Sequence, residues 1–325
     1  MPPFGDMTAG DVKVAVSDAV TFGPGLSLLC GDGFDATSQN LADKSKQGLL
    51  PEHVLVATVQ DQVRGAIATQ PAEGGVGWIW SPAVAGFASD STEASVLSRT
   101  LIQAAVAQLT RAGCRLVQAL LTPSDPRRFD FEASGFLYLT DMICMECSQL
   151  SHAETGSVVA ELEFVSFDRS TEHEFEAVIE QTYQGSLDCS ELDGIRSVAE
   201  TLQGYRASGS FRPELWLLAR QRGVFVGCVL LAFFPEEDRC ELQYMGIVPQ
   251  ARGRQLGRVL CARALRDARQ IGASRVCLSV DARNHPAIRQ YGTLGFVETE
   301  RRRVYILKVD LVRAQSYPQF EKRIL

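Results

Sequence analysis

The chain lacks the features that mark membrane and secreted proteins. No apolar run approaches the ~18 residues that a membrane-spanning helix needs. Its first residues, MPPFGDMTAG, have neither the charged nor the apolar region of a signal peptide. The nine cysteines are an odd number and occur singly in apolar stretches, which argues against a disulfide framework. These absences predict a cytoplasmic protein with no membrane partner.

Basic residues are too few to favour binding to nucleic acid. The chain has a formal net charge of -7 and a pI near 5.3, whereas nucleic-acid binding needs a basic footprint. We therefore predict no nucleic-acid partner, although a local basic pocket for an anionic ligand stays compatible with this charge. A single CMEC motif, at Cys144 and Cys147, has no second cysteine pair. We interpret it as part of a strand and predict no metal site.

The order of the expected elements indicates an internal duplication. The 325 residues suggest about two domains. A helical period over 93–113 precedes a strand over 114–121 in the first half. A second such helix over 257–273 precedes a strand over 275–280. We predict an α/β (α+β) protein of two tandem domains, 1–155 and 156–325. The competing arrangement is one large mixed sheet.

A loop in the second half, VPQARGRQLG over 248–257, has the composition of an anion site. Pro249 ends the preceding strand, and Gly253 lets the backbone turn tightly. The helix that follows presents unpaired N–H groups and the positive end of its dipole. Arg252 and Arg254 add charge that would suit a diphosphate. By itself the loop is equally compatible with a solvated basic turn.

Two motifs together distinguish these alternatives. RGRQLG follows the pattern Arg/Gln-x-x-Gly-x-Gly/Ala, with Arg252 first and Gly257 last, but Gln255 replaces the fourth-place glycine. About 30 residues later a second pattern, Asn-x-x-Ala-x-x-x-Tyr-x-x-x-Gly-Phe, is matched by Asn284, Ala287, Tyr291, Gly295 and Phe296. In this order and spacing, the region from roughly 215 to 310 resembles the GNAT superfamily of N-acetyltransferases.

The resemblance implies acetyl-CoA as cosubstrate and assigns roles to residues. The backbone of Gly246, Ile247 and Val248 would bind the acetyl and pantetheine portions. The pyrophosphate would lie on the amides of Arg252, Gly253, Arg254, Gln255, Leu256 and Gly257. Asn284, with Ala287 in the same motif, would bind the pantetheine arm or fix the neighbouring turn. Tyr291 would give its proton to the leaving thiolate, because a phenol is protonated at neutral pH.

The sequence offers two carboxylates as the base that deprotonates the attacking amine. We favour Glu241, which alternates with Gln243 and Met245 and would share their face of the strand. Asp281 is an alternative, and an amine that binds already neutral would need no base. In this family, the region over 181–216 forms a wall of the acceptor site. Its acids Asp188, Glu191 and Asp193 would bind a cationic amine or merely cap and solvate a helix.

The first half lacks the chemistry of the second. After its strand it offers GFASDSTEASVL, in which Asp90 and Glu93 would repel a diphosphate. Phe129 or Phe131 replaces the tyrosine and cannot donate a proton. We therefore expect two tandem GNAT-like domains, each a mixed, mostly antiparallel sheet flanked by helices. The first would be a degenerate, non-catalytic domain, an arrangement similar to the mycothiol synthases.

The sequence thus predicts an acetyl-CoA-dependent N-acetyltransferase whose active site lies in the C-terminal domain. A primary amine of a small molecule or peptide would attack the bound thioester directly. The alternative is a non-catalytic acyl-CoA-binding or regulatory module. It is favoured by Gln255 and by Ser279, which stands on its strand where some members of the family have a glutamate. The acceptor and the oligomeric state are left open.

Overall fold

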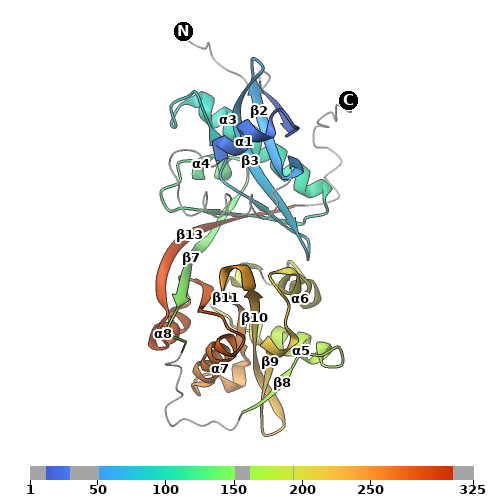
Figure 1. Ribbon diagram of the computed structural model, residues 1–325, viewed down its shortest axis with the longest axis vertical. Helices are drawn as coiled ribbons and strands as arrows, with labels where there is room; N and C mark the ends of the chain where they lie inside the picture. The colour runs from blue at the N-terminus through green and yellow to red at the C-terminus, as the bar shows by residue number, and fades with distance from the viewer. Residues whose placement is uncertain (1–11, 30–50, 151–161, 193, 310–325) are drawn as a thin grey trace. The chain divides into compact units, whose positions relative to one another are not determined.

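The computed structural model describes residues 12–29, 51–150, 162–192 and 194–309 and divides the chain into two compact units (Figure 1). The first unit comprises 1–139 together with 303–325, and the second comprises 140–302. Within the described ranges, no helix has the length and apolar character needed to cross a membrane.

The first unit is a mixed sheet with helices, in the strand order β1-β2-β3-β4-β6-β13 and with β5 beside β3. β4 and β6 are parallel, and the other recorded pairs in this unit are antiparallel. Its elements are β1 (Lys13–Val16), α1 (Phe22–Leu29), β2 (Val54–Val59), β3 (Gln62–Ala72), β4 (Val76–Ile79), β5 (Ala83–Val84), α3 (Thr92–Arg111), β6 (Leu116–Leu121) and α4 (Arg128–Ala133).

The second unit repeats this plan in the strand order β8-β9-β10-β11-β12-β7. Here β11 and β12 form the parallel pair. Its elements are β8 (Glu163–Ser166), α5 (Glu172–Tyr183), α6 (Val198–Ala207), β9 (Trp216–Gln221), β10 (Val224–Phe234), β11 (Arg239–Ile247), α7 (Leu256–Gln270), β12 (Arg275–Asp281) and α8 (His285–Thr293). The predicted fold class, two tandem units with mixed, mostly antiparallel sheets, is confirmed.

The two units exchange their last strands. β7 (Leu137–Cys147) pairs with β12 of the second unit through residues 142–147. Conversely, β13 (Val297–Lys308) pairs with β6 of the first unit through residues 303–308. The compact units therefore do not follow the expected boundary after residue 155. Both strands have the same apolar alternation, so their sequences do not reveal which sheet each one joins.

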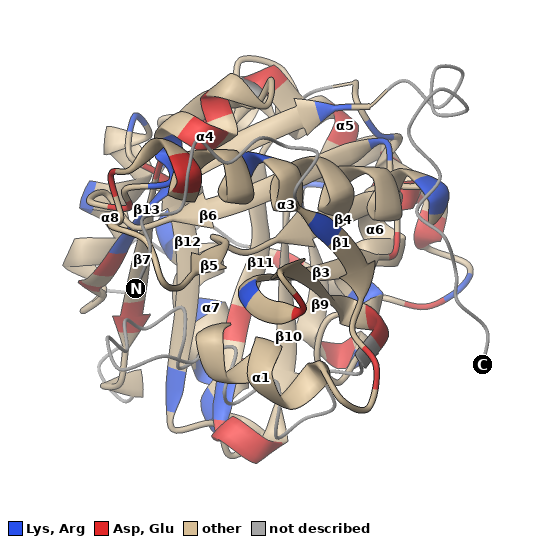
Figure 2. Ribbon diagram, turned by 90° about the horizontal axis from the view of Figure 1, so that it is seen from above, with Lys and Arg blue, Asp and Glu red and all other residues tan. Residues whose placement is uncertain are grey.

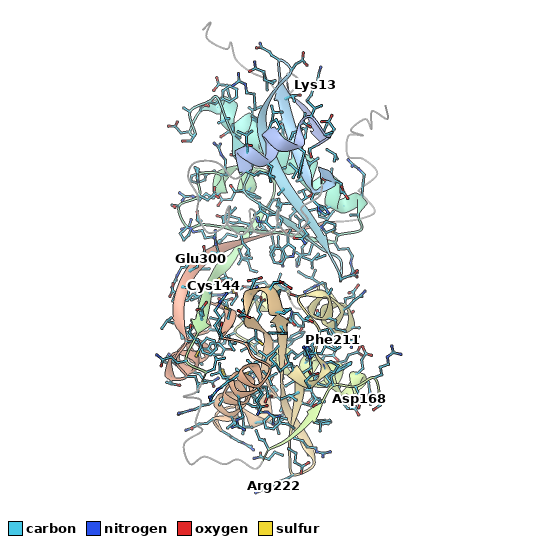
Figure 3. The ribbon with its side chains drawn as sticks, viewed as in Figure 1. Lys13, Cys144, Asp168, Phe211, Arg222 and Glu300 are labelled. Atoms are coloured by element: carbon cyan, nitrogen blue, oxygen red, sulfur yellow. The ribbon has the colours of Figure 1, made fainter. Side chains whose placement is uncertain are left out.

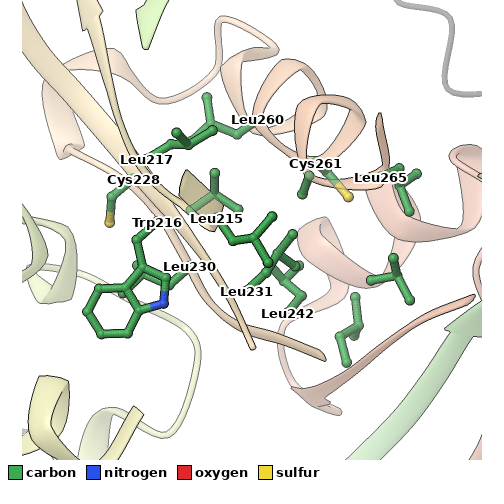
Figure 4. Packing of buried hydrophobic residues seen from close by; sticks show 14 of the residues in the cluster. Leu215, Trp216, Leu217, Cys228, Leu230, Leu231, Leu242, Leu260, Cys261 and Leu265 are labelled. Atoms are coloured by element: carbon green, nitrogen blue, oxygen red, sulfur yellow. The ribbon is translucent and has the colours of Figure 1, made fainter. Parts of the chain in front are cut away.

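Helix α7 packs its apolar face on the sheet of the second unit (Figure 4). Leu260, Cys261 and Leu265 are buried there, as the helical period predicts. Leu217 and Leu231 reach the same layer from β9 and β10, since alternate strand residues point to opposite faces. This packing holds the first turn of α7 at the end of β11, where the candidate site lies.

The other face of this sheet carries an aromatic cluster with a cation inside it. Trp216 is fully buried, and its ring centroid lies 4.9 Å from that of Phe211, which is labelled in Figure 3. The guanidinium carbon of Arg206 lies 4.6 Å from the Phe167 ring centroid, and its Nη2 lies 2.6 Å from Glu172. This cluster joins α5, α6 and β9 and so stabilises the segment over 181–216.

Charges and cysteines are distributed as an ordinary folded chain requires. Acidic and basic residues are interspersed along the ribbon (Figure 2). The cysteines of the described ranges are all free thiols. Cys144, labelled in Figure 3, and Cys147 both lie in β7, where Cys147 is buried. The CMEC motif is therefore part of a strand, as predicted.

The strand exchange predicts how fragments of the chain behave. A fragment of residues 140–302 keeps the β7 segment that covers the edge of β12, whereas 156–325 loses it and also leaves the end of β13 without β6. We expect 140–302 to show cooperative thermal unfolding by circular dichroism and 156–325 to aggregate or lack a transition, because it exposes unpaired strand edges. Equal melting temperatures for the two fragments would contradict the exchange.

Candidate active site

The central feature of the second unit is the parting of two parallel strands. β11 and β12 pair from Arg239↔Arg275 as far as Leu242↔Leu278. Beyond these residues β11 continues only with β10, and β12 only with β7. A register shift opposite Leu230 and Leu231 leaves Gln243 as an extra residue at the point of parting. We call the resulting opening the strand split.

The backbone groups that face the split follow from strand alternation. The Val248 amide donates to the Val226 carbonyl of β10 at 3.0 Å. Gly246, two residues earlier, faces the same way, so the amides of Met245 and Ile247 face the split. The sequence predicted that the backbone of Gly246, Ile247 and Val248 binds the acetyl group. Of these three residues, only Ile247 directs its amide toward the split. The Met245 amide also faces the split, but the sequence analysis did not identify it.

Position 246 is a glycine because there is no room for a side chain there. A Cβ atom at this position would lie 2.6 Å from the Thr182 side-chain oxygen, which is closer than real contacts allow. The glycine therefore lets the end of α5 approach β11. Because amides along a strand alternate between its two edges, the sequence could have suggested Met245 together with Ile247. Which edge they face depends on the pairing of β11 with β10, and that pairing is known only from the structure.

The loop after β11 presents a row of free amides. Pro249–Ala251 form a 3-10 turn, Gly253 has a φ of 77°, and α7 begins at Leu256. Within the described part of the chain, the amides from Gly253 to Gly257 donate to no protein acceptor. α7 also has no side-chain cap. The loop thus offers five consecutive donors at the positive end of a helix, a ready anion site.

Arg252 does not share this role. Its guanidinium donates to three backbone carbonyls, those of Ile247 at 3.1 Å, Gly185 at 3.0 Å and Thr182 at 2.8 Å. Its amide donates to the Pro249 carbonyl at 3.3 Å. Arg252 therefore ties the loop to the end of α5, and the exposed Arg254 is the arginine left to add charge for a phosphate.

The unusual residue of the motif adopts a conformation that glycine would prefer. Gln255 has φ 59° and ψ 13°, in the left-handed region, and directly precedes the first helical residue. A side chain with a Cβ costs about 1–2 kcal/mol in this conformation, whereas glycine adopts it freely. The replacement is therefore strained, but the amide of Gln255 stays among the free donors.

Helix α8 places the candidate acid. Asn284 caps it by accepting a hydrogen bond from the Ala287 amide at 3.3 Å, so Asn284 fixes the turn, one of its two expected roles. Tyr291 is buried, and its ring centroid lies 5.5 Å from that of Phe296. Its hydroxyl makes no hydrogen bond to protein in the described ranges. Burial raises the pKa of Tyr291 above that of an ordinary phenol, which keeps it protonated.

The two expected carboxylate bases are already engaged. Glu241 lies in the paired part of β11, and its Oε2 accepts a hydrogen bond from Arg239 at 3.0 Å. The extra residue Gln243 breaks the alternation, so Glu241 does not share a face with Met245 as the sequence suggested. Six residues of strand, about 20 Å, separate Glu241 from Ile247. This geometry disfavours Glu241 as the base.

Asp281 is engaged still more fully. It is completely buried and accepts hydrogen bonds from Thr140 at 2.7 Å, from the Cys189 amide and from Arg283. Although burial opposes ionisation, the hydrogen bonds of Arg283 and Thr140 lower the pKa of Asp281 to about 2. A carboxylate with this pKa is a poor proton acceptor.

The remaining acids of the predicted wall divide into different roles. Glu191 forms a bidentate pair with Arg283, at 2.5 and 3.0 Å. Asp188 accepts a hydrogen bond from the Asp281 amide at 2.8 Å. Asp188, Cys189 and Asp281 are close enough to share an ion, but the Arg283 cation already neutralises Asp281. Asp193 lies outside the described residues.

The first unit lacks the free helix end and the tyrosine of the second unit at the corresponding positions. Its helix α3 is capped by Ser91, whose side chain accepts a hydrogen bond from the Ala94 amide at 3.1 Å. Phe131 takes the place that Tyr291 has in the second unit, and its ring centroid lies 5.1 Å from that of Phe136. This unit thus offers neither an uncapped helix end nor a phenol at these positions.

The chain is similar to known proteins in both sequence and fold. Residues 174–296 match the acetyltransferase (GNAT) family. The chain is 37% identical over 95 residues to a mycothiol acetyltransferase of Streptomyces bingchenggensis, which is 29% of this chain and 31% of that protein. It is 36% identical over 97 residues to the mycothiol acetyltransferase of Thermomonospora curvata, or 30% and 32% of the two chains. The match thus spans about a third of each relative's length.

Solved structures show that the likeness in fold extends further. A GCN5-related N-acetyltransferase from Sphaerobacter thermophilus has a TM-score of 0.61 at 16% identity and covers 93% of this chain and 97% of its own. A tandem GNAT protein from the clavulanic acid biosynthesis pathway has a TM-score of 0.54 at 15% identity, with 91% and 98% covered. Residues 174–296 therefore resemble the acetyltransferase (GNAT) family, and the chain shares its fold with a tandem GNAT protein.

Proposed function

We propose that the protein is an acetyl-CoA-dependent N-acetyltransferase whose active site lies in the second unit. The observation that carries the proposal is the strand split, which adjoins five free amides at the start of α7. The split exposes backbone donors along an extended edge, which suits a pantetheine arm, and the loop suits a pyrophosphate. The residues of the site therefore fit this cosubstrate.

The chain's own groups would then perform direct transfer. The Ile247 amide, directed into the split, would polarise the thioester carbonyl. The amine nitrogen would attack the carbonyl carbon, and the C–S bond would break as the C–N bond forms. Tyr291, protonated and without a protein partner for its hydroxyl, would give its proton to the thiolate. Much of the rate would come from holding the two substrates together.

The acceptor we propose is a primary amine of a small molecule or a peptide. The curated relatives named mycothiol acetyltransferases support a small-molecule acceptor. We assign the first unit a non-catalytic role, since it has a capped α3 and Phe131 in place of a tyrosine.

A rival function is favoured by one observation. The strained Gln255 is what a loop released from selection for catalysis would tolerate, so a non-catalytic acyl-CoA-binding module is the second candidate. The two candidates agree on cosubstrate binding and differ on turnover, so the experiments below separate them.

Acetyl-CoA is expected to raise the melting temperature of the full chain in a thermal-shift assay. Gly257→Glu should abolish this shift, because it places a negative charge among the free amides. The new Cβ meets only the flexible end of Gln290, so the variant should fold. Gly292→Glu, on α8 with open space around it, is the matched control and should keep the shift. No shift in the wild type would refute the cosubstrate.

Tyr291→Phe should lower the rate of CoA release by about 10²-fold or more, a typical loss for a general acid, with the acetyl-CoA thermal shift unchanged. The assay would offer ethanolamine, glucosamine and a glycine tripeptide as probe amines. Tyr138→Phe, an exposed tyrosine in the first unit, should have the wild-type rate. Wild-type binding without turnover of any probe would favour the rival function, and full activity of the phenylalanine variant would remove Tyr291 from the mechanism.

Gln255→Gly should stabilise the protein by about 1 kcal/mol, because glycine relieves the left-handed strain, and should preserve acetyl-CoA binding. The matched control is Gln270→Gly at the end of the same helix, which should destabilise by up to about 1 kcal/mol. Chemical denaturation measures both. A destabilised glycine variant at 255 would show that the Gln255 side chain has a favourable role.

A further inference from the structure

One carboxylate outside the motifs lies at the strand split. The Ala282 amide donates to the Asp141 carbonyl on β7 at 2.8 Å. Because adjacent strand residues face opposite edges, the Asp281 amide points the other way, toward the edge that β11 has left. There it donates to Asp188 Oδ1 at 2.8 Å. Asp188 therefore covers the opened edge of β12.

The loop that carries Asp188 is held firmly in this place. The Asp188 amide donates to Ser186 Oγ at 3.1 Å, and the Cys189 amide donates to Asp281 Oδ2 at 3.2 Å. Arg283 bridges Asp281 and Glu191. Backbone hydrogen bonds and the neighbouring ion pairs thus fix the loop that carries the carboxylate, as a reacting group requires.

One oxygen of Asp188 is left for a ligand. Within the described ranges, Oδ1 accepts the Asp281 amide and Oδ2 has no recorded hydrogen bond. The side chain is open to solvent, yet desolvation by the protein around it raises the pKa of Asp188 above that of an ordinary aspartate.

The surroundings of Asp188 connect the proposed acid to the acceptor wall. The negative charge of Asp188 contributes to raising the pKa of both Tyr291 and Tyr205. The Tyr205 ring stacks on Tyr244 at 6.3 Å, and the Tyr183 ring meets Tyr244 edge-on at 5.8 Å. Asp188 thus acts electrostatically on Tyr205, which belongs to this group of rings, and on Tyr291.

We propose that Asp188 is the carboxylate that receives the proton of the acceptor's ammonium group in the second unit. This assignment rests on the proposed function and takes over the role that the sequence gave to Glu241. Asp188 Oδ2 would accept one proton from R–NH₃⁺ and pass it to solvent. The neutral nitrogen then forms the C–N bond, the C–S bond breaks, and the thiolate takes the Tyr291 proton. The second N–H proton restores Tyr291, so one proton is released per turnover.

The pH dependence of the variant Asp188→Asn tests this role. Asparagine keeps an oxygen that can accept the Asp281 amide, so folding and the acetyl-CoA thermal shift should persist. The rate of CoA release from the three probe amines should fall about 10²-fold. In the wild type the rate should fall as pH drops through the raised pKa of Asp188, and this limb should vanish in the variant. The charged or titratable neighbours, Asp281, Arg283, Glu191, Cys189, Tyr205 and Tyr291, remain in both proteins.

The variant Glu241→Gln tests the other candidate base, and its rate of CoA release should stay within a few fold of the wild-type rate. If Asp188→Asn keeps the wild-type rate and pH profile, or if Glu241→Gln carries the loss instead, the Asp188 assignment is overturned while the transferase survives. A wild type that acetylates no probe amine would instead contradict the proposed function, and the base assignment with it. Asp188→Glu, which restores a carboxylate, should recover part of the rate and the acidic limb.

Discussion

β11 and β12 part after Leu242 and Leu278. The rest of the second unit depends on which groups provide hydrogen-bond partners for the two strand edges that this parting exposes. Backbone groups inside a protein need hydrogen-bond partners. The Ile247 carbonyl takes Arg252, and the Asp281 amide takes Asp188. The amides that remain face the opening. These two contacts stabilise the split and also define its shape, because each joins a strand edge to the segment around the end of α5.

Arg252 is a motif residue that positions the loop through backbone carbonyls and does not itself offer its guanidinium to the proposed ligand. A cation in the first place of the motif would be expected to meet the pyrophosphate, yet its guanidinium binds three carbonyls between the end of α5 and the end of β11. Positive charge is favourable at the end of α5 because the carbonyls there lack helical partners. In the proposed site the anion would therefore be bound by the backbone amides, for which the identity of the side chain matters less. This division explains why the loop tolerates Gln255 at the cost of local strain.

The two units show how one fold supports different chemistry. Their strands follow the same order, and both have an aromatic pair at equivalent places, Phe131 with Phe136 and Tyr291 with Phe296. A single oxygen separates a packing residue from a candidate acid. Likewise, Ser91 caps α3 whereas α7 is uncapped. Because these differences leave the packed core intact, one copy is free to lose its site and remain folded.

The sequence by itself determined the duplication and the fold class, and the order of two motifs indicated the loop over 252–257, because periodicity and motif order are local properties. It also singled out Asn284, which caps α8, and Tyr291, which is buried on that helix, but their roles stay predictions. Tertiary structure decided the rest. Strand register turned Met245 rather than Gly246 toward the split, and the bulge at Gln243 separated Glu241 from it. The exchange of β7 and β13 and the meeting of Asp188 with the edge of β12 join residues about 90 to 190 positions apart. Such pairings depend on which edges are left open after folding, and no local pattern in the chain encodes that.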